Sequence, residues 1–229
     1  MHTLIVGAAP VAGADDHYAH VIAEAGVLIA ADAGLVLCRA AGRMPDVCVG
    51  DFDSTPVDVL QQAERAGARI VRFPAEKDES DLDLALGVAR ESGAPEVRFT
   101  AAFAGRLDHT LAAIGTVVAA ADLGAVCEEP GWTGYALREA ARATLELYER
   151  PGTVISLIAL GGPARVTTDG LAYPLRESTI QPVSSLGLSN VATAGSQAIN
   201  VLSGALLVIV NRSEGTEMLR SALDRTDTL

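Results

Sequence analysis

Asp46-Val47-Cys48-Val49-Gly50-Asp51-Phe52-Asp53-Ser54 is a short apolar run that ends in a pair of carboxylates. The run predicts a buried strand over Asp46–Asp51, because nearly continuous hydrophobicity is typical of a strand covered on both faces. Asp51 and Asp53 are two positions apart, so their side chains point to one side of an extended chain and can reach the same hard cation. A carboxylate directly after a buried strand is costly without a partner. We interpret this stretch as a metal and phosphate site.

The chain from Thr3 to about Gly124 repeats this arrangement of a short apolar run followed by a helical pattern. The apolar runs predict strands over Thr3–Ala8, Val27–Asp32, Asp46–Asp51, Ala68–Pro74 and Glu96–Phe103. Apolar residues at i, i+3 and i+4 predict helices over His17–Ala25, Leu35–Ala41, Pro56–Ala66, Asp81–Ser92 and Asp108–Leu123. Such alternation favours a parallel, doubly wound sheet with right-handed crossovers.

After about Ala125 the apolar runs are separated by Gly, Pro and Thr, and helical patterns are nearly absent. Strands are predicted over Tyr135–Leu137, Thr144–Tyr148, Thr153–Leu160, Ala164–Thr167, Thr179–Val183 and Ala205–Val210. This spacing fits an antiparallel sandwich or a small barrel. Glu128-Glu129-Pro130-Gly131 is the most linker-like segment between the halves. The predicted fold class is α/β, with a parallel-sheet domain in 1–127 and an all-β domain in 132–229.

The composition excludes several classes of protein. The chain has 229 residues, of which 49% are hydrophobic, so it can bury a real core, yet no apolar run is as long as a membrane span. The N-terminus lacks the features of a signal peptide, and we expect a soluble, cytoplasmic protein. A net charge of −12 argues against a nucleic-acid partner but leaves room for a small anionic substrate bridged by a cation. The three cysteines suit neither a metal knuckle nor a disulfide framework, and we interpret each as a small apolar residue.

Polar residues follow several of the predicted strands. In an open parallel sheet, ligands bind outside the carboxyl ends of the strands, so these residues are the candidates for a site. Four groups stand out and are expected to meet at one edge: Asp32, the Asp51 and Asp53 pair, the segment Lys77–Asp83, and Arg106 with Asp108. Arg106 offers a planar fork of donors to a phosphate, and Gly105 leaves room for the phosphate to approach the backbone.

Each group also has a structural interpretation. Ser54-Thr55-Pro56 resembles a helix start with a hydroxyl cap, and Ser80-Asp81-Leu82-Asp83 resembles a capping box. Arg106 and Asp108 suit an ion pair at a helix start. His109 is more often a capping or packing residue than a base, and Ser189-Asn190 alone suggests a turn. The residues by themselves leave these alternatives open.

Taken together, the motifs resemble the thiamine pyrophosphokinase family from about residue 27 to residue 210. The resemblance rests on the number, order and spacing of short motifs: Ala31-Asp32-Ala33-Gly34, Pro45-Asp46, Gly50-Asp51-Phe52-Asp53-Ser54, Lys77-Asp78-Glu79-Ser80-Asp81, Gly105-Arg106-Leu107-Asp108-His109, Ser156-Leu157-Ile158, Gly170-Leu171-Ala172-Tyr173-Pro174-Leu175 and Ser189-Asn190. It implies a Rossmann-like N-terminal domain, a C-terminal β-sandwich, and a homodimer with active sites between subunits. It also implies Mg²⁺, with ATP and thiamine as substrates and thiamine diphosphate and AMP as products.

The resemblance and the chemistry together imply a role for each site residue. The metal ligands would be Asp51, Asp53 and Asp81, with Asp78 and Asp108 supporting or joining them. Lys77 and Arg106 would contact the phosphates. ATP would also meet Asp32, Ser54, Ser80 and His109. The acceptor heterocycle would meet Ser189 and Asn190 of the partner subunit.

Three positions depart from the family pattern. Ala33 replaces a usual glycine, Ser80 a usual threonine, and Ala113 a common asparagine. Because of Ala113, a pyrophosphokinase that acts on another hydroxymethyl heterocycle, such as a pterin, remains an alternative function. A sensor that binds nucleotide or thiamine without turnover is a further alternative, against which the intact Asp, Lys and Arg set argues.

Overall fold

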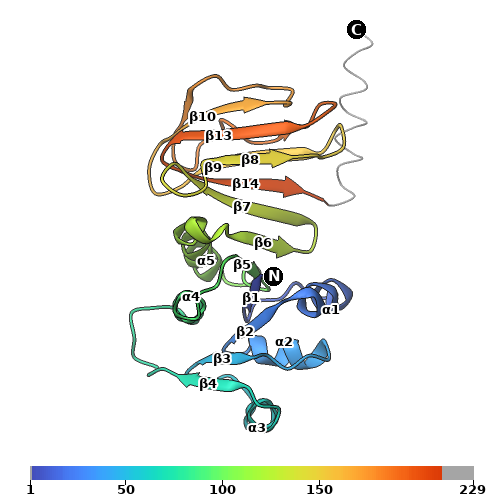
Figure 1. The fold of residues 1–229 in the computed structure, drawn as a ribbon, viewed down its shortest axis with the longest axis vertical. Coiled ribbons are helices and arrows are strands. Elements are labelled where there is room, and N and C mark those ends of the chain that lie inside the picture. The colour runs from blue at the N-terminus through green and yellow to red at the C-terminus, as the bar shows by residue number, and fades with distance from the viewer. Residues whose placement is uncertain (1, 213–229) are drawn as a thin grey trace. The chain divides into compact units, whose positions relative to one another are not determined.

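The structure, a computed structural model, describes residues 2–212 (Figure 1). The chain folds into two compact units. The first unit comprises Met1–Pro130, and the second begins at Gly131. The first contains the alternating strands and helices that its sequence predicts, and the second consists of strands. The predicted α/β class is confirmed.

The first unit is a parallel sheet with the strand order β6-β5-β1-β2-β3-β4. Its strands are β1 (Thr3–Val6), β2 (Val27–Ala31), β3 (Val47–Gly50), β4 (Arg69–Arg72), β5 (Val97–Thr100) and β6 (Val126–Glu129). The chain moves outward from β1 to β4 and then returns to the other side of β1 as β5. A doubly wound sheet of this kind has its ligand crevice where the order reverses, which here lies between β1 and β5.

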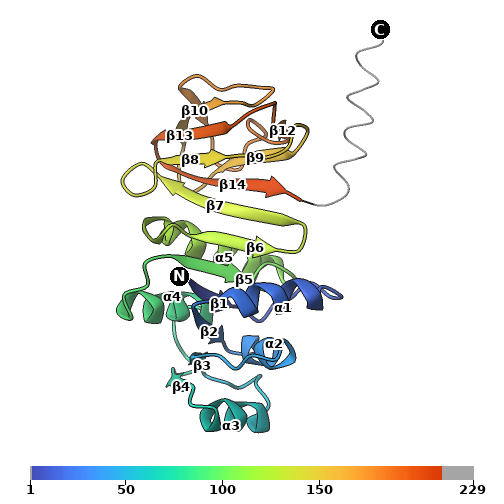
Figure 2. The ribbon, with the colours of Figure 1, turned by 45° about the vertical axis from the view of Figure 1, so that its right-hand side comes forward.

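Helices cover both faces of this sheet. They are α1 (Asp15–Glu24), α2 (Gly34–Ala40), α3 (Val57–Arg65), α4 (Asp81–Glu91) and α5 (Leu107–Ala119), followed by the 3₁₀ turn η1 (Ala121–Leu123). The contacts pair α1 with α2, α2 with α3, and α4 with α5, so the helices form two groups (Figures 1 and 2). Because the sheet is covered on both faces, strand residues such as Leu4, Val6 and Leu28 are fully buried, as their continuous hydrophobicity predicts.

The second unit packs two antiparallel layers of strands. One layer has the order β12-β9-β14-β7 and the other β11-β10-β13-β8. The strands are β7 (Trp132–Arg138), β8 (Thr144–Leu147), β9 (Val154–Ala159), β10 (Ala164–Asp169), β11 (Ser178–Ile180), β12 (Asn190–Val191), β13 (Gln197–Ser203) and β14 (Ala205–Asn211). Apolar side chains from both layers, including Leu157, Val166 and Ile199, form one core. Of the two architectures that the sequence left open, the sandwich is correct.

Three strands were not predicted, and one predicted linker is wrong. Glu128 and Glu129 belong to β6, and Glu129 is buried. A carboxylate can end a buried strand here because its oxygens accept hydrogen bonds from within the fold. The strands β12 and β13 were also missed, since Gln197–Ser203 alternates buried and more exposed residues and carries several polar ones.

The structure of residues 2–212 tests two expectations from composition, one about the cysteines and one about membrane spans. Cys38, Cys48 and Cys127 are all buried and free, as expected of small apolar residues. Burial raises the pKa of Cys38 and of Cys48 to about 12, which keeps these thiols protonated and unreactive. Within the same residues, no helix combines the length and the apolar character that a membrane crossing requires.

Replacing Gly34 with alanine should lower the free energy of unfolding by about 1–3 kcal/mol, the usual range for overpacking. An added Cβ would lie 2.3 Å from the Val6 carbonyl oxygen, so the start of α2 would have to move off the sheet. Gly87→Ala is the control, because a Cβ in the middle of α4 meets no atom within 4 Å and should add about 0.5–1 kcal/mol. Urea denaturation of both variants measures the difference, and a Gly34→Ala protein as stable as Gly87→Ala would contradict the close approach.

Candidate active site

A pocket of about 520 Å³ opens at the carboxyl ends of the parallel strands. Residues that follow β1, β2, β3 and β5 line it, together with the start of α4 and the start of α5. Its polar lining consists of Asp32, Asp51, Lys77, Glu79, Ser80, Asp81, Asp108 and His109. The pocket therefore occupies the edge at which the sequence predicts a site, and it brings together members of all four predicted groups.

Three carboxylates form the centre of the site. Asp32, Asp51 and Asp53 each offer an oxygen, and these oxygens all lie within 4.8 Å of one another. Asp51 and Asp53 also share a turn, in which the Asp53 backbone N–H donates to Asp51 Oδ1 at 3.1 Å. Phe52, between them, has a φ of 62°, a left-handed conformation that turns the chain sharply. The predicted closeness of Asp51 and Asp53 is present, and Asp32 joins them as a third carboxylate.

Hydroxyl groups hold Asp32 in place. Ser54 Oγ donates to Asp32 Oδ2, and Thr55 Oγ1 donates to Asp32 Oδ1 at 3.1 Å. The interpretation of these hydroxyls as a helix cap is wrong, because α3 begins after Pro56 without any side-chain cap. Both oxygens of Asp32 are thus partnered even though Asp32 is buried, which removes the usual penalty of an unsatisfied polar group.

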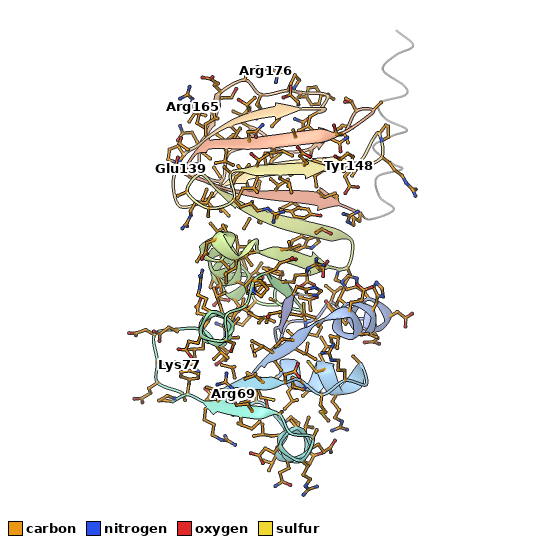
Figure 3. The ribbon with its side chains drawn as sticks, in the orientation of Figure 1. Arg69, Lys77, Glu139, Tyr148, Arg165 and Arg176 are labelled. Carbon is orange, nitrogen blue, oxygen red and sulfur yellow. The ribbon has the colours of Figure 1, made fainter. Side chains whose placement is uncertain are left out.

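Lys77 lies in the segment between β4 and α4, where Figure 3 labels it. Its side chain bridges the carboxylate centre and the start of α4. Its Nζ lies 2.8 Å from Asp81 Oδ1 and 3.6 Å from Asp51 Oδ2. Burial acts to lower the pKa of Lys77, but the hydrogen bond and charge of Asp81 and the charge of Asp51 raise it overall. The Asp53 N–H, followed by Lys77, lowers the pKa of Asp51 against the effect of burial. The site therefore holds Lys77 as a cation and Asp51 as an anion.

The start of α4 is a complete capping box, as one structural interpretation expected. Ser80 Oγ accepts the Asp83 N–H at 3.2 Å, and Asp83 Oδ2 accepts the Ser80 N–H at 3.2 Å. Asp83 Oδ1 also accepts a hydrogen bond of 2.5 Å from Thr116 Oγ1 of α5, so this carboxylate joins two helices. Ser80 still lines the pocket, whereas Asp78 is exposed and lies outside its lining. The predicted role of Asp78 has no contact in the structure to support it.

Arg106 and Asp108 form an exposed ion pair at the start of α5. Arg106 Nη2 lies 2.6 Å from Asp108 Oδ2, and the hydrogen bond from Arg106 lowers the pKa of Asp108 to about 2. Asp108 and His109 line the main pocket, while Arg106, Gly105 and His109 line an adjoining pocket of about 360 Å³. Arg106 is thus beside the carboxylate centre and not within it.

Small residues that the sequence analysis did not assign also form the pocket. Gly7, Ala8 and Ala9 follow β1, and Ala102 follows β5. An added Cβ at Gly7 would lie 2.6 Å from the Ala101 carbonyl oxygen, so the two strand ends meet closely at this point. A run of small residues directly after the first strand was the available signal. Ala113 is buried and lines the same pocket.

Ser189 and Asn190 lie in the second unit, where Asn190 begins β12 and is buried. Asn190 Nδ2 donates to the Tyr173 carbonyl at 2.7 Å, and Asn190 Oδ1 accepts the N–H groups of Tyr173 and Val191. The Ser189 N–H donates to Ser156 Oγ at 3.1 Å. The Asn190 side chain therefore fixes the Tyr173 segment, and its predicted contact with an acceptor stays a prediction.

Comparison with known proteins gives a match in each unit. The model described as "Thiamin pyrophosphokinase, catalytic domain" matches residues 18–126, and that described as "Thiamin pyrophosphokinase, vitamin B1 binding domain" matches residues 142–207. The thiamine pyrophosphokinase of Bacillus subtilis (strain 168) is 37% identical over 83 residues, which span 36% of this chain and 39% of that relative.

Solved structures share the fold over most of the chain. A thiamine pyrophosphokinase from Bacillus subtilis has a TM-score of 0.77 at 22% identity and covers 92% of this chain and 99% of its own. A thiamin pyrophosphokinase from Geobacillus thermodenitrificans has a TM-score of 0.77 at 24% identity, with coverages of 94% and 100%. One from Candida albicans has a TM-score of 0.74 at 13% identity, with coverages of 92% and 90%. With a family model matched in each of its two units, the chain belongs to the thiamin pyrophosphokinase family.

Proposed function

We propose that this chain transfers a pyrophosphoryl group from Mg-ATP to the hydroxyl of thiamine, giving thiamine diphosphate and AMP. The observation that carries the proposal is the cluster of Asp32, Asp51 and Asp53 beside Lys77, in a pocket at the point where the strand order reverses. Residues 1–127 would bind ATP and carry out the chemistry, and residues 132–229 would bind thiamine and form a dimer. A cytoplasmic location, where Mg-ATP is available, belongs to the same proposal.

The donor set fits a magnesium ion. Mg²⁺ prefers oxygen ligands and is held by one or two carboxylates together with substrate phosphates, and three carboxylate oxygens here lie within 4.8 Å of one another. Asp51 and Asp53 are the proposed ligands, with Asp32 close enough to share the ion. Asp81 remains a proposed ligand, although its nearer oxygen is bound to Lys77. When bound, Mg²⁺ would neutralise phosphate charge and orient the triphosphate.

The basic groups would bind the phosphates. Lys77 is held between Asp51 and Asp81, so a phosphate that enters the pocket can take over one of its contacts without a large movement. Arg106 and His109 line the adjoining pocket and would reach the same chain of phosphates from the other side. Ser54 and Ser80 would act mainly by fixing Asp32 and the start of α4.

The reaction needs positioning more than a strong base. The thiamine hydroxyl oxygen attacks the β-phosphorus in line, and the bond from that phosphorus to the oxygen of the α-phosphate breaks, so AMP leaves with that oxygen. The hydroxyl proton passes to a nearby carboxylate or to solvent as the new bond forms. Lys77 and Arg106 would stabilise the charge that develops on the transferred phosphates.

A second copy of the chain would complete the acceptor site. The segment around Ser189 and Asn190 exposes large apolar side chains, among them Tyr173 at 61%, Val183 at 82% and Leu186 at 46%. Val183 also has a φ of 52°, a conformation that is unfavourable for a β-branched residue. Exposed apolar groups next to the proposed acceptor residues support an interface between subunits at this segment.

The nucleotide product distinguishes this reaction from ordinary kinase chemistry. Purified protein with Mg-ATP and thiamine should release AMP in a one-to-one ratio with thiamine diphosphate, because the β-phosphorus is attacked. Chromatography of the nucleotides measures this ratio, with a hydroxymethylpterin as the matched acceptor. Stoichiometric ADP would contradict the proposal, a preference for the pterin would change the acceptor, and nucleotide binding without any product would indicate a sensor.

Asp51→Asn should reduce turnover by roughly 10²-fold or more, since it removes a charged ligand from the centre of the site. The fold should persist, because Asp51 lies on the pocket surface and outside the apolar core. The control is Asp58→Asn, which removes an exposed carboxylate that lies 3.6 Å from Arg39 on the surface of the same unit. Steady-state rates across a Mg²⁺ titration test the role, which is wrong if the Asp51 variant keeps near-normal activity at saturating Mg²⁺.

Val183→Asp should shift the protein from dimer to monomer and reduce thiamine turnover together, because a charge would be buried at the proposed interface. Tyr148→Asp is the control, since Tyr148 is 80% exposed but lies outside the segment 173–190. Light scattering combined with activity assays measures both effects. A monomer with full activity would contradict an active site shared between subunits.

A further inference from the structure

Glu129 is a buried carboxylate that the proposed chemistry does not use. It ends β6 with an exposure of 3%, and its charge is not matched by any salt bridge within residues 2–212. Its oxygens instead accept hydrogen bonds from two different segments of the first unit. Glu129 Oε1 accepts the Ala102 N–H at 3.2 Å, and Glu129 Oε2 accepts the Tyr18 hydroxyl at 3.0 Å.

One of these segments is the turn that follows β5. Ala101 is fully buried and has a φ of 53°, a left-handed conformation that costs free energy for a residue with a Cβ. The backbone amide of Ala102, the next residue, donates a hydrogen bond to Glu129 Oε1. The Ala101 carbonyl accepts the Ala9 N–H at 2.7 Å, which ties the turn to the end of β1. Glu129 thus compensates for an unfavourable backbone conformation at the point where two strand ends meet.

The other segment is the loop between β1 and α1. Tyr18 is 1% exposed and anchored in the core, and its hydroxyl accepts the Val11 N–H at 2.8 Å while donating to Glu129. Burial and the charge of Glu129 raise the pKa of Tyr18, so the phenol stays protonated and can donate. Through Tyr18, the same carboxylate therefore fixes the loop that carries Ala8 and Ala9.

These two segments form one wall of the nucleotide pocket. Ala8, Ala9 and Ala102 line the main pocket, and Ala8–Pro10 with Ala104–Arg106 line the adjoining one. Apart from Arg106, these residues have small side chains, so the position of the backbone itself decides how closely a phosphate chain can approach. Both segments depend on the same buried group.

We propose that Glu129 is a positioning residue for nucleotide binding, which holds the β1–α1 loop and the β5–α5 turn in the arrangement that admits the phosphates of ATP. Glu129 lies outside the lining of both pockets and acts through Ala102 and Tyr18. The inference rests on the proposed function for the identity of the nucleotide. The geometry of the two loops stands without it.

These donors suit the ionised form of Glu129, because the Tyr18 hydroxyl and the Ala102 N–H both donate to its carboxylate oxygens. Burial raises its pKa to about 7, although the hydrogen bonds from Ala102, Tyr18 and Ala101 oppose that rise. The groups that face it are Tyr18 from α1 and Cys127 from its own strand. His17 contacts the Glu128 carbonyl, and Arg98 binds the Glu128 carboxylate. As the pH falls below about 7, Glu129 takes up a proton and its hold on both loops weakens.

The test compares Glu129→Gln with Glu128→Gln, which removes the neighbouring carboxylate of the same strand. The Glu128 side chain binds Arg98 and reaches neither loop, so it is a matched control. In Glu129→Gln, KM for Mg-ATP should rise about tenfold or more, the change expected from losing hydrogen bonds to a charged group. KM for thiamine should change by less than about twofold, because the wall contacts only the nucleotide.

The pH profile separates positioning from general weakening of the fold. We expect kcat/KM for ATP of Glu128→Gln, divided by that of Glu129→Gln, to be largest above pH 7. The ratio should shrink below pH 7, where Glu129 of the control is protonated and therefore neutral, like the glutamine of the other variant. The ionisation of ATP is common to both variants and cancels from this ratio. Hydrogen exchange at the Ala102 and Val11 amides, followed by NMR, should be faster in Glu129→Gln than in the control.

Tyr18→Phe keeps the inference testable if Glu129→Gln fails to fold. It removes the acceptor for the Val11 N–H while leaving Glu129 bound to Ala102, so it should also raise KM for ATP selectively. Equal increases in KM for ATP and thiamine would overturn the proposal, as would faster exchange at both amides with an unchanged KM for ATP. If Glu129→Gln does not fold, an unchanged KM for ATP in Tyr18→Phe would overturn the proposal.

Binding of Mg²⁺ with a non-hydrolysable ATP analogue, measured by calorimetry, distinguishes this inference from the proposed function. If the wild-type protein makes no AMP but Glu129→Gln binds the analogue more weakly than Glu128→Gln, the function is wrong and the positioning role holds. If wild type makes AMP and both variants bind the analogue equally, the function holds and the positioning role is wrong.

Discussion

The mutual repulsion of three carboxylates is the constraint on which the site depends. Asp32, Asp51 and Asp53 have oxygens within 4.8 Å of one another, and each pair of like charges at such a distance costs on the order of a few kcal/mol at an effective dielectric constant of about 20. The fold holds them together by the parallel pairing of β2 with β3, in which Ala31 lies opposite Val49. The hydroxyls of Ser54 and Thr55 and the ammonium of Lys77 supply partial compensation. A divalent cation would complete it.

The pocket combines this charged centre with a wall of small residues. The charges come from residues after β2 and β3 and from the start of α4, while the wall comes from residues after β1 and β5. The two sides have different requirements. The centre needs opposite charges at short range, and the wall needs a backbone held in a fixed position, which buried hydrogen bonds to Glu129 supply. In the proposed reaction, activity depends on both.

The sequence predicted the parts of the fold that repeat a simple pattern. The buried strands of the parallel sheet were found because they are continuously apolar, and Asp51 and Asp53 because a strand end directs both to one edge. The sequence did not reveal Glu129, since a pair of glutamates before proline and glycine suggests a surface linker, and only tertiary hydrogen bonds make such a residue stable in a buried strand. Ser54 and Thr55 were ambiguous for the same reason. A hydroxyl next to a helix start caps the helix unless a more distant acceptor, here Asp32, is available.

In the proposed reaction, Asp51 and Asp53, with Asp32 close enough to share the ion, hold the divalent cation of the nucleotide complex. The most direct test is a crystal structure with Mn²⁺ and a non-hydrolysable ATP analogue, in which anomalous scattering locates the metal. We expect an anomalous peak within coordination distance of Asp51 and Asp53 and next to the β-phosphate. A peak elsewhere, for example at Asp108 alone, or an analogue bound away from these carboxylates would contradict it.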